Sequence, residues 1–169
     1  MAGNFTTGYG TALSPTVTNL QSLASSSTFQ SGWTSNWIDN TSVKAEDYLI
    51  TAAIVAGTTP TAGSVRVYAY AQHSDGTTAP DLFSSGTEGT EGAATVHDSE
   101  QLDASLVLLW SSSIDTTTND VYTMPPRSIA QAFGCVPRKF ALYIAHDTVA
   151  ALKSTGNAVY ADPISGAYT

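Results

Sequence analysis

Hydrophobic and polar residues alternate with a period of two in the clearest part of this chain, residues 65–71. One face of that run carries Val65, Val67 and Ala69, and the other carries Arg66, Tyr68 and Tyr70. Such alternation is typical of a strand with one face in a core. A strongly apolar run at 48–55 precedes it, and the segment 57–63, with its glycines and a proline, separates the two. The sequence therefore predicts an antiparallel pair joined by a long loop.

Shorter apolar runs predict the remaining strands. They lie at 29–38, 106–110, 121–124, 140–146 and 158–161. A weaker extended segment begins at Val17, Pro125-Pro126 ends one strand, and residues 127–133 fit a single helical turn closed by Gly134. About eight short strands without alternating helices predict an all-β fold. We expect an antiparallel β-sandwich of the jelly-roll type.

Two polar stretches define the expected domain organisation. Residues 1–15 are small, polar and rich in glycine, and we expect a flexible N-terminal arm that becomes ordered against a neighbour. Residues 16–169 are expected to form a single β-sandwich domain, because a chain of this length can bury one core. Within it, 72–103 predicts one long polar loop, of the kind used for binding, for an interface or as a mobile tip. Its acidic residues are Asp75, Asp81, Glu88, Glu91, Asp98, Glu100 and Asp103.

Charge narrows the range of partners. The formal net charge is −8, the pI is about 4.4, and only 12% of the residues are charged. No basic run is present, so binding to nucleic acid through phosphates is not expected, and neither is attraction to an anionic membrane. The chain has no apolar run long enough to span a bilayer and no secretion signal at its start, so no membrane partner is predicted.

Residues suited to catalysis do not form a convincing set. His146 and Asp147 are neighbours at the end of a predicted strand, so their side chains point to opposite faces, and we expect His146 to bond the local backbone. The contiguous residues 73–75, His-Ser-Asp, cannot supply the geometry of a hydrolase triad. Cys135 is the lone cysteine and is expected to be a small buried hydrophobe. The sequence therefore predicts no catalytic residues and no enzyme.

Cofactor and metal signatures are missing as well. The acidic loop lacks the regular aspartate spacing of a calcium loop, and Glu88 and Glu91 lie among glycines and threonines. The segment 57–63 contains glycines but lacks the lysine and the following helix of a phosphate loop. We expect no cofactor and no metal, and we interpret the acidic loop as solvated.

Aromatic residues offer the one candidate surface. Arg66, Tyr68 and Tyr70 share a face of the alternating strand. Two uses fit these side chains, because tyrosine and arginine are enriched at protein interfaces and aromatic faces also bind sugars. Both a protein interface and a glycan face remain open at this point.

Two blocks of the chain resemble small structural proteins of tailed bacteriophages. The first is the C-terminal part, 126–134 followed by 136–148 and 151–152, which includes Val-Pro-Arg-Lys-Phe-Ala-Leu-Tyr-Ile-Ala-His-Asp-Thr at 136–148. The second includes Gly32-Trp33, 38–41, 47–50 and 57–60. The resemblance is one of strands and turns and includes no active-site motif, so it transfers no functional residues.

The resemblance implies a non-enzymatic virion structural protein, made in the host cytoplasm. A compact acidic domain with an arm favours a capsid decoration or cement subunit on the phage head. The alternatives are a tail or fibre component, although we find no internal repeat of the kind that fibre shafts show, and a carbohydrate-binding module for receptor recognition. The implied partners are the major capsid or tail proteins. Low charge and exposed strand edges predict a homo-oligomer, with a trimer favoured over a dimer.

Overall fold

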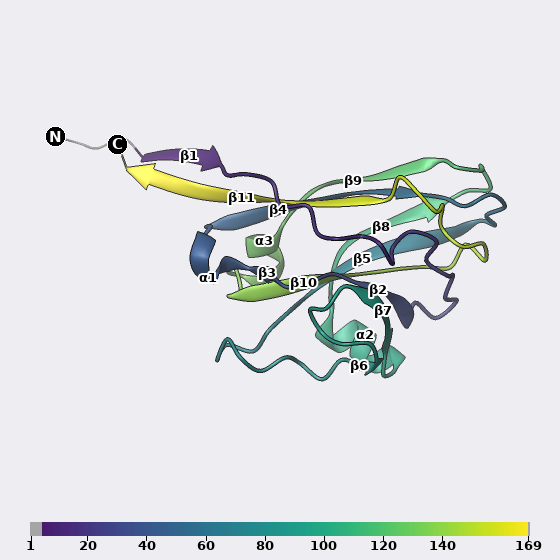
Figure 1. Cartoon of the computed structure of the whole chain (residues 1–169), viewed down its shortest axis with the longest axis horizontal. Coiled ribbons are helices and arrows are strands. Elements are labelled where there is room, and N and C mark those ends of the chain that lie inside the picture. Colours follow the sequence, from purple (N-terminus) through teal and green to yellow (C-terminus); the bar gives the residue numbers. More distant parts are fainter. Residues whose placement is uncertain (1–4, 169) are drawn as a thin grey trace.

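The computed structural model describes residues 5–168, and these form an antiparallel β-sandwich with three short helices (Figure 1). The first sheet has the order β1-β11-β4-β9. Its strands are β1 (Phe5–Tyr9), β11 (Ala158–Tyr168), β4 (Asp47–Val55) and β9 (Val121–Ser128). The second has the order β6-β7-β2-β10-β5-β8, with β3 also paired to β10. Its strands are β6 (Phe83–Ser85), β7 (Gly92–Val96), β2 (Ser31–Thr34), β10 (Lys139–His146), β5 (Gly63–Ala71), β8 (Val107–Ile114) and β3 (Ile38–Asp39).

Strand pairing confirms the jelly-roll prediction. If β3, β6 and β7 are set aside, eight strands remain. The first of these pairs with the last, the second with the second to last, and so on inward. The pairs are β1 with β11, β2 with β10, β4 with β9, and β5 with β8. Successive pairs alternate between the two sheets, as when a long antiparallel ribbon folds over on itself. This is the double-sheet arrangement of a jelly roll.

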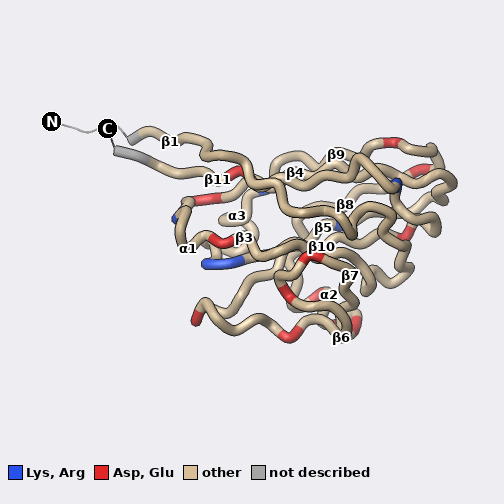
Figure 2. Tube along the Cα trace, viewed as in Figure 1, with Lys and Arg blue, Asp and Glu red and all other residues tan. Residues whose placement is uncertain are grey.

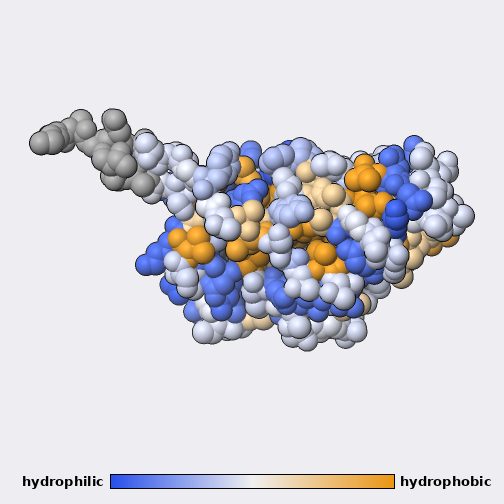
Figure 3. Space-filling view, turned by 45° about the horizontal axis from the view of Figure 1, so that its top comes forward, coloured by the Kyte–Doolittle hydropathy of each residue, from blue (hydrophilic) through white to orange (hydrophobic). Residues whose placement is uncertain are grey.

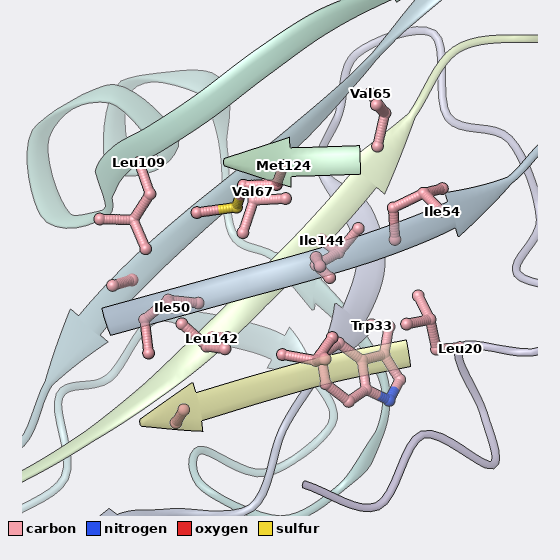
Figure 4. Close-up of a cluster of buried hydrophobic side chains, with 14 of the residues drawn as sticks. Leu20, Trp33, Ile50, Ile54, Val65, Val67, Leu109, Met124, Leu142 and Ile144 are labelled. Carbon is pink, nitrogen blue, oxygen red and sulfur yellow. The ribbon is translucent and has the colours of Figure 1, made fainter. Parts of the chain in front are cut away.

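The main core lies between the two sheets (Figure 4). Val65 and Val67 of β5 point into it, as the alternating pattern predicted, and they meet Ile50 and Ile54 of β4 in the facing sheet. Trp33 of β2 is fully buried in the same cluster. Each such side chain contributes about 1.5–3 kcal/mol when it leaves water, so these alternating runs account for the formation of the sandwich.

A second cluster covers the outer face of the β5 and β10 sheet. Residues 72–106, here called the covering segment, fold back over that face and place Phe83 and Leu102 against it. The prediction of one long polar loop is therefore wrong: the segment contains β6, β7 and the helix α2 (Ser99–Ser105). As a result β10 is buried on both faces from Phe140 to His146.

The covering segment is stabilised by short-range polar contacts. The carboxylate of Asp98 caps α2 by accepting a hydrogen bond from the backbone N–H of Gln101 at 2.7 Å. The strand β7 consists of small residues and pairs with β2 through Gly92 to Thr95. Sequence composition gives little strand signal here, because glycine and alanine are depleted in strands.

Both ends of the described chain meet in one ribbon. β1 pairs with the last part of β11, with Phe5 opposite Tyr168 and Tyr9 opposite Ile164. Because β4 pairs with β11 only as far as Ile164, the ribbon extends past the end of β4 (Figure 1). Part of the expected arm is thus a strand paired within the same chain, while residues 1–4 lie outside the described residues.

Two local predictions near Pro125-Pro126 have different outcomes. The strand β9 does not stop at these prolines, since it continues to Ser128. An edge strand tolerates proline because one side of its backbone needs no partner. The predicted helical turn is confirmed as α3 (Ile129–Phe133), and Gly134 closes it with a φ of +78°. The remaining helix, α1 (Asn40–Val43), is capped at its N-terminus by the side chain of Asp39.

Candidate interaction surface

The residues Arg66, Tyr68 and Tyr70 lie on one face of β5, as predicted, but the tyrosines do not form an exposed platform. Tyr70 is fully buried and Tyr68 is 3% exposed, because the covering segment lies over them. The ring of Tyr70 makes edge contacts with Trp37 and Phe83, at centroid distances of 5.4 and 5.6 Å. The expectation of a glycan face at these tyrosines is corrected by this burial.

Polar contacts of Tyr70 also identify it as a structural residue. Its hydroxyl lies 2.6 Å from the Thr34 hydroxyl and accepts a hydrogen bond from the backbone N–H of Gly89 at 2.8 Å. Burial raises the pKa of Tyr70 to about 12, so the phenol stays neutral and keeps these bonds.

Arg66 lies at the margin of the same aromatic cluster. Its guanidinium stacks over the ring of Phe29, 3.8 Å from the centroid, and donates a hydrogen bond to the Tyr68 hydroxyl at 3.4 Å. A cation over an aromatic ring stabilises by about 0.5–2 kcal/mol. Arg66 therefore contributes to closing the cluster at the Phe29 turn.

Glu88 and Glu91, which we considered as metal ligands, instead accept hydrogen bonds from other parts of the chain. Glu91 accepts hydrogen bonds from the backbone N–H of Asn19 at 2.7 Å and from the indole N–H of Trp33 at 2.9 Å. Glu88 accepts from the backbone N–H groups of Leu82 and Phe83, at 2.9 and 3.1 Å. Within residues 5–168, no group of three His, Cys, Asp or Glu side chains is placed to hold a metal ion.

His146 is enclosed rather than presented to a cleft. Its Nε2 lies 3.0 Å from the carbonyl of Leu23 and its Nδ1 lies 3.0 Å from the Thr148 hydroxyl. The expected bond to the local backbone is wrong in its partner, because the backbone carbonyl that His146 contacts belongs to the distant residue Leu23. Burial lowers the pKa of His146 below its ordinary value of 6.5, against the opposing influence of the Leu23 carbonyl and Asp147. The Asp147 carboxylate instead accepts from the backbone N–H of Ser64.

Cys135 departs from its prediction, because the structure exposes it. It follows Gly134 in the connection between α3 and β10, which lies at the surface. A connecting segment keeps its backbone polar groups near water, and this exposes short side chains within it.

Sequence reasoning missed the surface that the fold leaves uncovered, the outer face of the β1-β11-β4-β9 sheet. Along β11, Val159 and Ala161 point to the core, so Tyr160 and Ile164 point outward. We call the outward-facing set the open face. Its residues, matched by strand register, are Tyr9, Asp47, Leu49, Thr51, Ala53, Val121, Thr123, Tyr160, Asp162 and Ile164.

The open face is flat, weakly charged and partly apolar. Asp47 and Asp162 are the charged residues in the set, and much of these strands is free of charge in Figure 2. Tyr9, Val121 and Tyr160 are exposed by 75, 54 and 44%. Figure 3, which brings the top of the molecule forward, shows apolar patches between weakly polar residues. A surface of this kind loses little hydration energy when a protein covers it.

A signal for the open face was present in the sequence but could not be interpreted alone. The run 158–161 and the alternation at 48–55 both contain outward positions with apolar side chains. Which sheet face stays uncovered depends on where the covering segment folds, and this is a long-range relationship.

Comparisons with known proteins do not assign the chain to a group. No family model, curated protein or solved structure matches it. Among the described residues, no helix is long and apolar enough to cross a membrane.

Proposed function

We propose that the chain is a non-enzymatic structural protein of a tailed bacteriophage particle, and specifically a decoration or cement subunit that attaches to the head. The observation that carries this proposal is the open face. One sheet of the sandwich is covered on its outer side by residues 72–106, whereas the other has no such cover among the described residues. A subunit that docks flat on a larger protein surface needs such a face.

The fold supports the proposal independently of the residue resemblance. Jelly rolls with two packed sheets are common among viral capsid and lectin domains. Fold alone does not establish function, so the open face and the composition carry the choice between these uses. The tyrosines first considered for sugar binding are buried, which removes the platform on which the carbohydrate-binding alternative rested.

The size of the open face indicates how attachment works. Three strands, β11, β4 and β9, spaced about 4.8 Å apart and about eight residues long, span roughly 14 by 26 Å, or about 360 Å², and β1 extends the face only beyond the end of β4. Each partner in a standard stable interface buries about 800 Å². A single open face therefore binds weakly, and firm attachment requires several subunits that bind one lattice together. The proposed partner is the major capsid protein, which supplies such a repeating surface.

Side-chain chemistry supports a role without catalysis. The buried histidine contacts a carbonyl and a hydroxyl inside the fold, and Glu88 and Glu91 of the covering segment accept hydrogen bonds from backbone N–H groups. These titratable groups have structural partners. The proposal therefore assigns the function to surface contact.

The test begins with the particle. Virions of the phage that encodes the chain are purified, the chain is detected by mass spectrometry, and gold-labelled antibody locates it by electron microscopy. Label on the head supports the proposal. Label on the tail or fibres would replace it with the tail alternative, and a virion without the chain would refute any virion role.

A variant pair then tests the open face. Particles made without the chain are incubated with purified protein carrying Tyr160→Asp, which adds a charge to the open face. The matched control is Ser113→Asp, on the exposed edge of the opposite sheet. We expect the first change to reduce attachment at least tenfold and the second to leave it unchanged. Equal attachment by both variants would exclude the open face.

A further inference from the structure

We propose that β1 pairs edge to edge with β1 of a second copy of this chain, which joins two four-stranded sheets into one across a two-fold axis. The proposal concerns the free protein and does not rest on the virion role. It starts from the position of β1 at the end of its sheet, with β11 as its ladder partner on one side.

Other sheet edges in the described chain have features that prevent pairing. β9 carries Pro125 and Pro126, which lack the N–H donors that a ladder needs. β8 carries a β-bulge, where its register with β5 shifts between Trp110 and Leu108, and β6 is only three residues long. These are the usual means by which proteins block edge-to-edge association.

β1 has none of these protective features. Residues 6–10 read Thr-Thr-Gly-Tyr-Gly, without a charge or a proline, and all five are exposed. A flat, uncharged edge of this kind is a template for another strand.

The ribbon that contains β1 is also short of partners. Beyond Ile164, β11 no longer pairs with β4, and its ladder partner is β1. A two-stranded ribbon is at best marginally stable in water, whereas three or more strands are stable. Pairing of two copies converts each two-stranded ribbon into part of a four-stranded one, which gives the ribbon the partners it lacks.

Backbone geometry fixes the register of the proposed pairing. The N–H of Gly10 donates to the carbonyl of Pro163 at 2.8 Å. Bonding direction alternates along an antiparallel strand, so residues 6, 8 and 10 bond toward β11 and Thr7 and Tyr9 direct their N–H and C=O outward. A two-fold axis beside Thr7 then places Thr7 opposite Thr7 of the second copy, and Tyr9 opposite residue 5.

This arrangement is self-complementary, which is why the proposed occupant is a second copy. In an isologous contact the same groups meet on both sides, and outward donors and acceptors centred on Thr7 satisfy each other in pairs. A closed ring of three would need a second, different edge. The candidate is the four-residue stretch Ser165–Tyr168 of β11, which is shorter than β1. The geometry therefore favours a dimer over the trimer expected from sequence.

The first test removes one outward donor. Thr7→Pro deletes the N–H that points to the second copy and leaves the bonds to β11 in place, because those come from residues 6, 8 and 10. Thr7→Val is the matched control, since it changes the side chain but keeps the N–H. Sedimentation equilibrium on the full chain should show a dimer for the wild type and for Thr7→Val. Thr7→Pro should weaken dimerisation at least tenfold, with an unchanged circular-dichroism spectrum.

The second test fixes the register by cross-linking. Directly opposed residues in an antiparallel pair have Cα atoms about 5.5 Å apart, within the range that a disulfide spans. A Cys135→Ser/Thr7→Cys variant should therefore form a covalent dimer on mild oxidation, seen on a non-reducing gel. The control, Cys135→Ser/Thr123→Cys, places the thiol on the distant β9 edge and should stay monomeric on the gel.

Several outcomes would overturn the proposal. They are a monomeric wild type at micromolar concentration, a trimer, a Thr7→Pro protein that dimerises as well as Thr7→Val, and equal cross-linking by both cysteine variants. Both experiments use isolated protein. A failure here is thus distinct from a failure of the particle-binding test, in which the readout is attachment to the head.

Discussion

The phenol oxygen of Tyr70 accepts a hydrogen bond from the backbone N–H of Gly89 at 2.8 Å, which ties the central strand β5 to the covering segment. The carbonyl of Gly89 accepts in turn from the backbone N–H of Trp37 at 3.1 Å. One turn residue thus bonds two segments that lie far apart in the sequence. The closed outer face of the β5 sheet depends on this junction, and so does the contrast with the open face.

Removing the Tyr70 hydroxyl tests the junction directly. Tyr70→Phe keeps the ring but leaves the N–H of Gly89 and the Thr34 hydroxyl without their partner inside the protein. Unsatisfied buried polar groups cost about 1–3 kcal/mol, and we expect a loss of that size in the free energy of unfolding. Urea denaturation followed by tryptophan fluorescence measures it. Unchanged stability would mean that water replaces the phenol.

Truncating the ring should cost more. Tyr70→Ala removes the contacts with Trp37 and Phe83 and leaves a cavity beneath the covering segment. Loss of a large buried aromatic side chain costs about 3–5 kcal/mol. The matched variant is Tyr160→Ala on the open face, where the side chain is 44% exposed and the expected loss is below about 1 kcal/mol. Similar losses in the two variants would contradict the assignment of covered and open faces.

The second prediction concerns the effect of adding a side chain at Gly89. Its φ is +64°, and a Cβ atom there would lie 2.0 Å from the indole nitrogen of Trp37. Gly89→Ala combines a left-handed backbone with a steric overlap, and we expect a loss of about 2–4 kcal/mol.

Gly92 is the control for that experiment. It lies in the same covering segment, and no atom is within 4 Å of the Cβ that alanine would add. Gly92→Ala should therefore change the melting temperature little, while Gly89→Ala lowers it by several degrees. If both variants had the same melting temperature, the close approach of Trp37 to Gly89 would have no energetic consequence.

Sequence reasoning succeeded where a strand carries its own strong signal. β4, β5 and β10 are rich in β-branched and aromatic residues, and their runs at 48–55, 65–71 and 140–146 gave both the strands and the sandwich. β7 was missed because glycine and alanine are depleted in strands, and β1 was missed because its threonines and aromatic residues lie in a short polar, glycine-rich stretch. Those strands form because a partner strand is already in place, and partner positions are set by the whole topology.

The candidate surface shows the same limit. The pattern correctly placed Tyr68 and Tyr70 on the face opposite Val65 and Val67, because that depends only on the alternation of a strand. Their burial depends on the covering segment, whose apolar contacts come from residues separated by polar turns. Cys135 was misjudged for a related reason, since its exposure follows from a surface connection rather than from its own chemistry.

Acid stability gives the third prediction, and its sign follows from His146. Burial lowers the pKa of this residue below 6.5 in the folded protein. Below pH 6.5 the unfolded chain therefore binds a proton that the folded protein does not, and stability falls as the pH decreases. Above about pH 7.5 neither state is protonated and His146 adds no pH dependence.

The expected slope is at most about 1.4 kcal/mol per pH unit, the value for one proton. Urea denaturation between pH 8 and pH 5 measures it. In His146→Gln this part of the slope should disappear, although the variant is less stable overall. The control is His97→Gln, at the surface beside Asp81, which should retain the slope. A slope that persists in His146→Gln would assign the acid sensitivity to other groups.

The last prediction concerns Asn157, a buried side chain that joins three segments at the end of the sandwich. Its Oδ1 accepts a hydrogen bond from the backbone N–H of Val55 at 2.8 Å, and its Nδ2 donates to Gln21 Oε1 and to the Lys153 carbonyl, both at 2.9 Å. Asn157→Ala leaves the strand-end N–H of Val55 unsatisfied, which costs about 1–3 kcal/mol, whereas the Lys153 carbonyl still accepts from the backbone N–H of Ser22 at 3.2 Å. Asn157→Asp separates the two halves of the amide, because the carboxylate still accepts from Val55 but cannot donate. We expect both variants to lose stability in thermal unfolding, and hydrogen exchange at the Val55 amide to increase much more in Asn157→Ala than in Asn157→Asp. Equal exchange at Val55 in the two variants would show that the Oδ1 bond does not hold the end of β4.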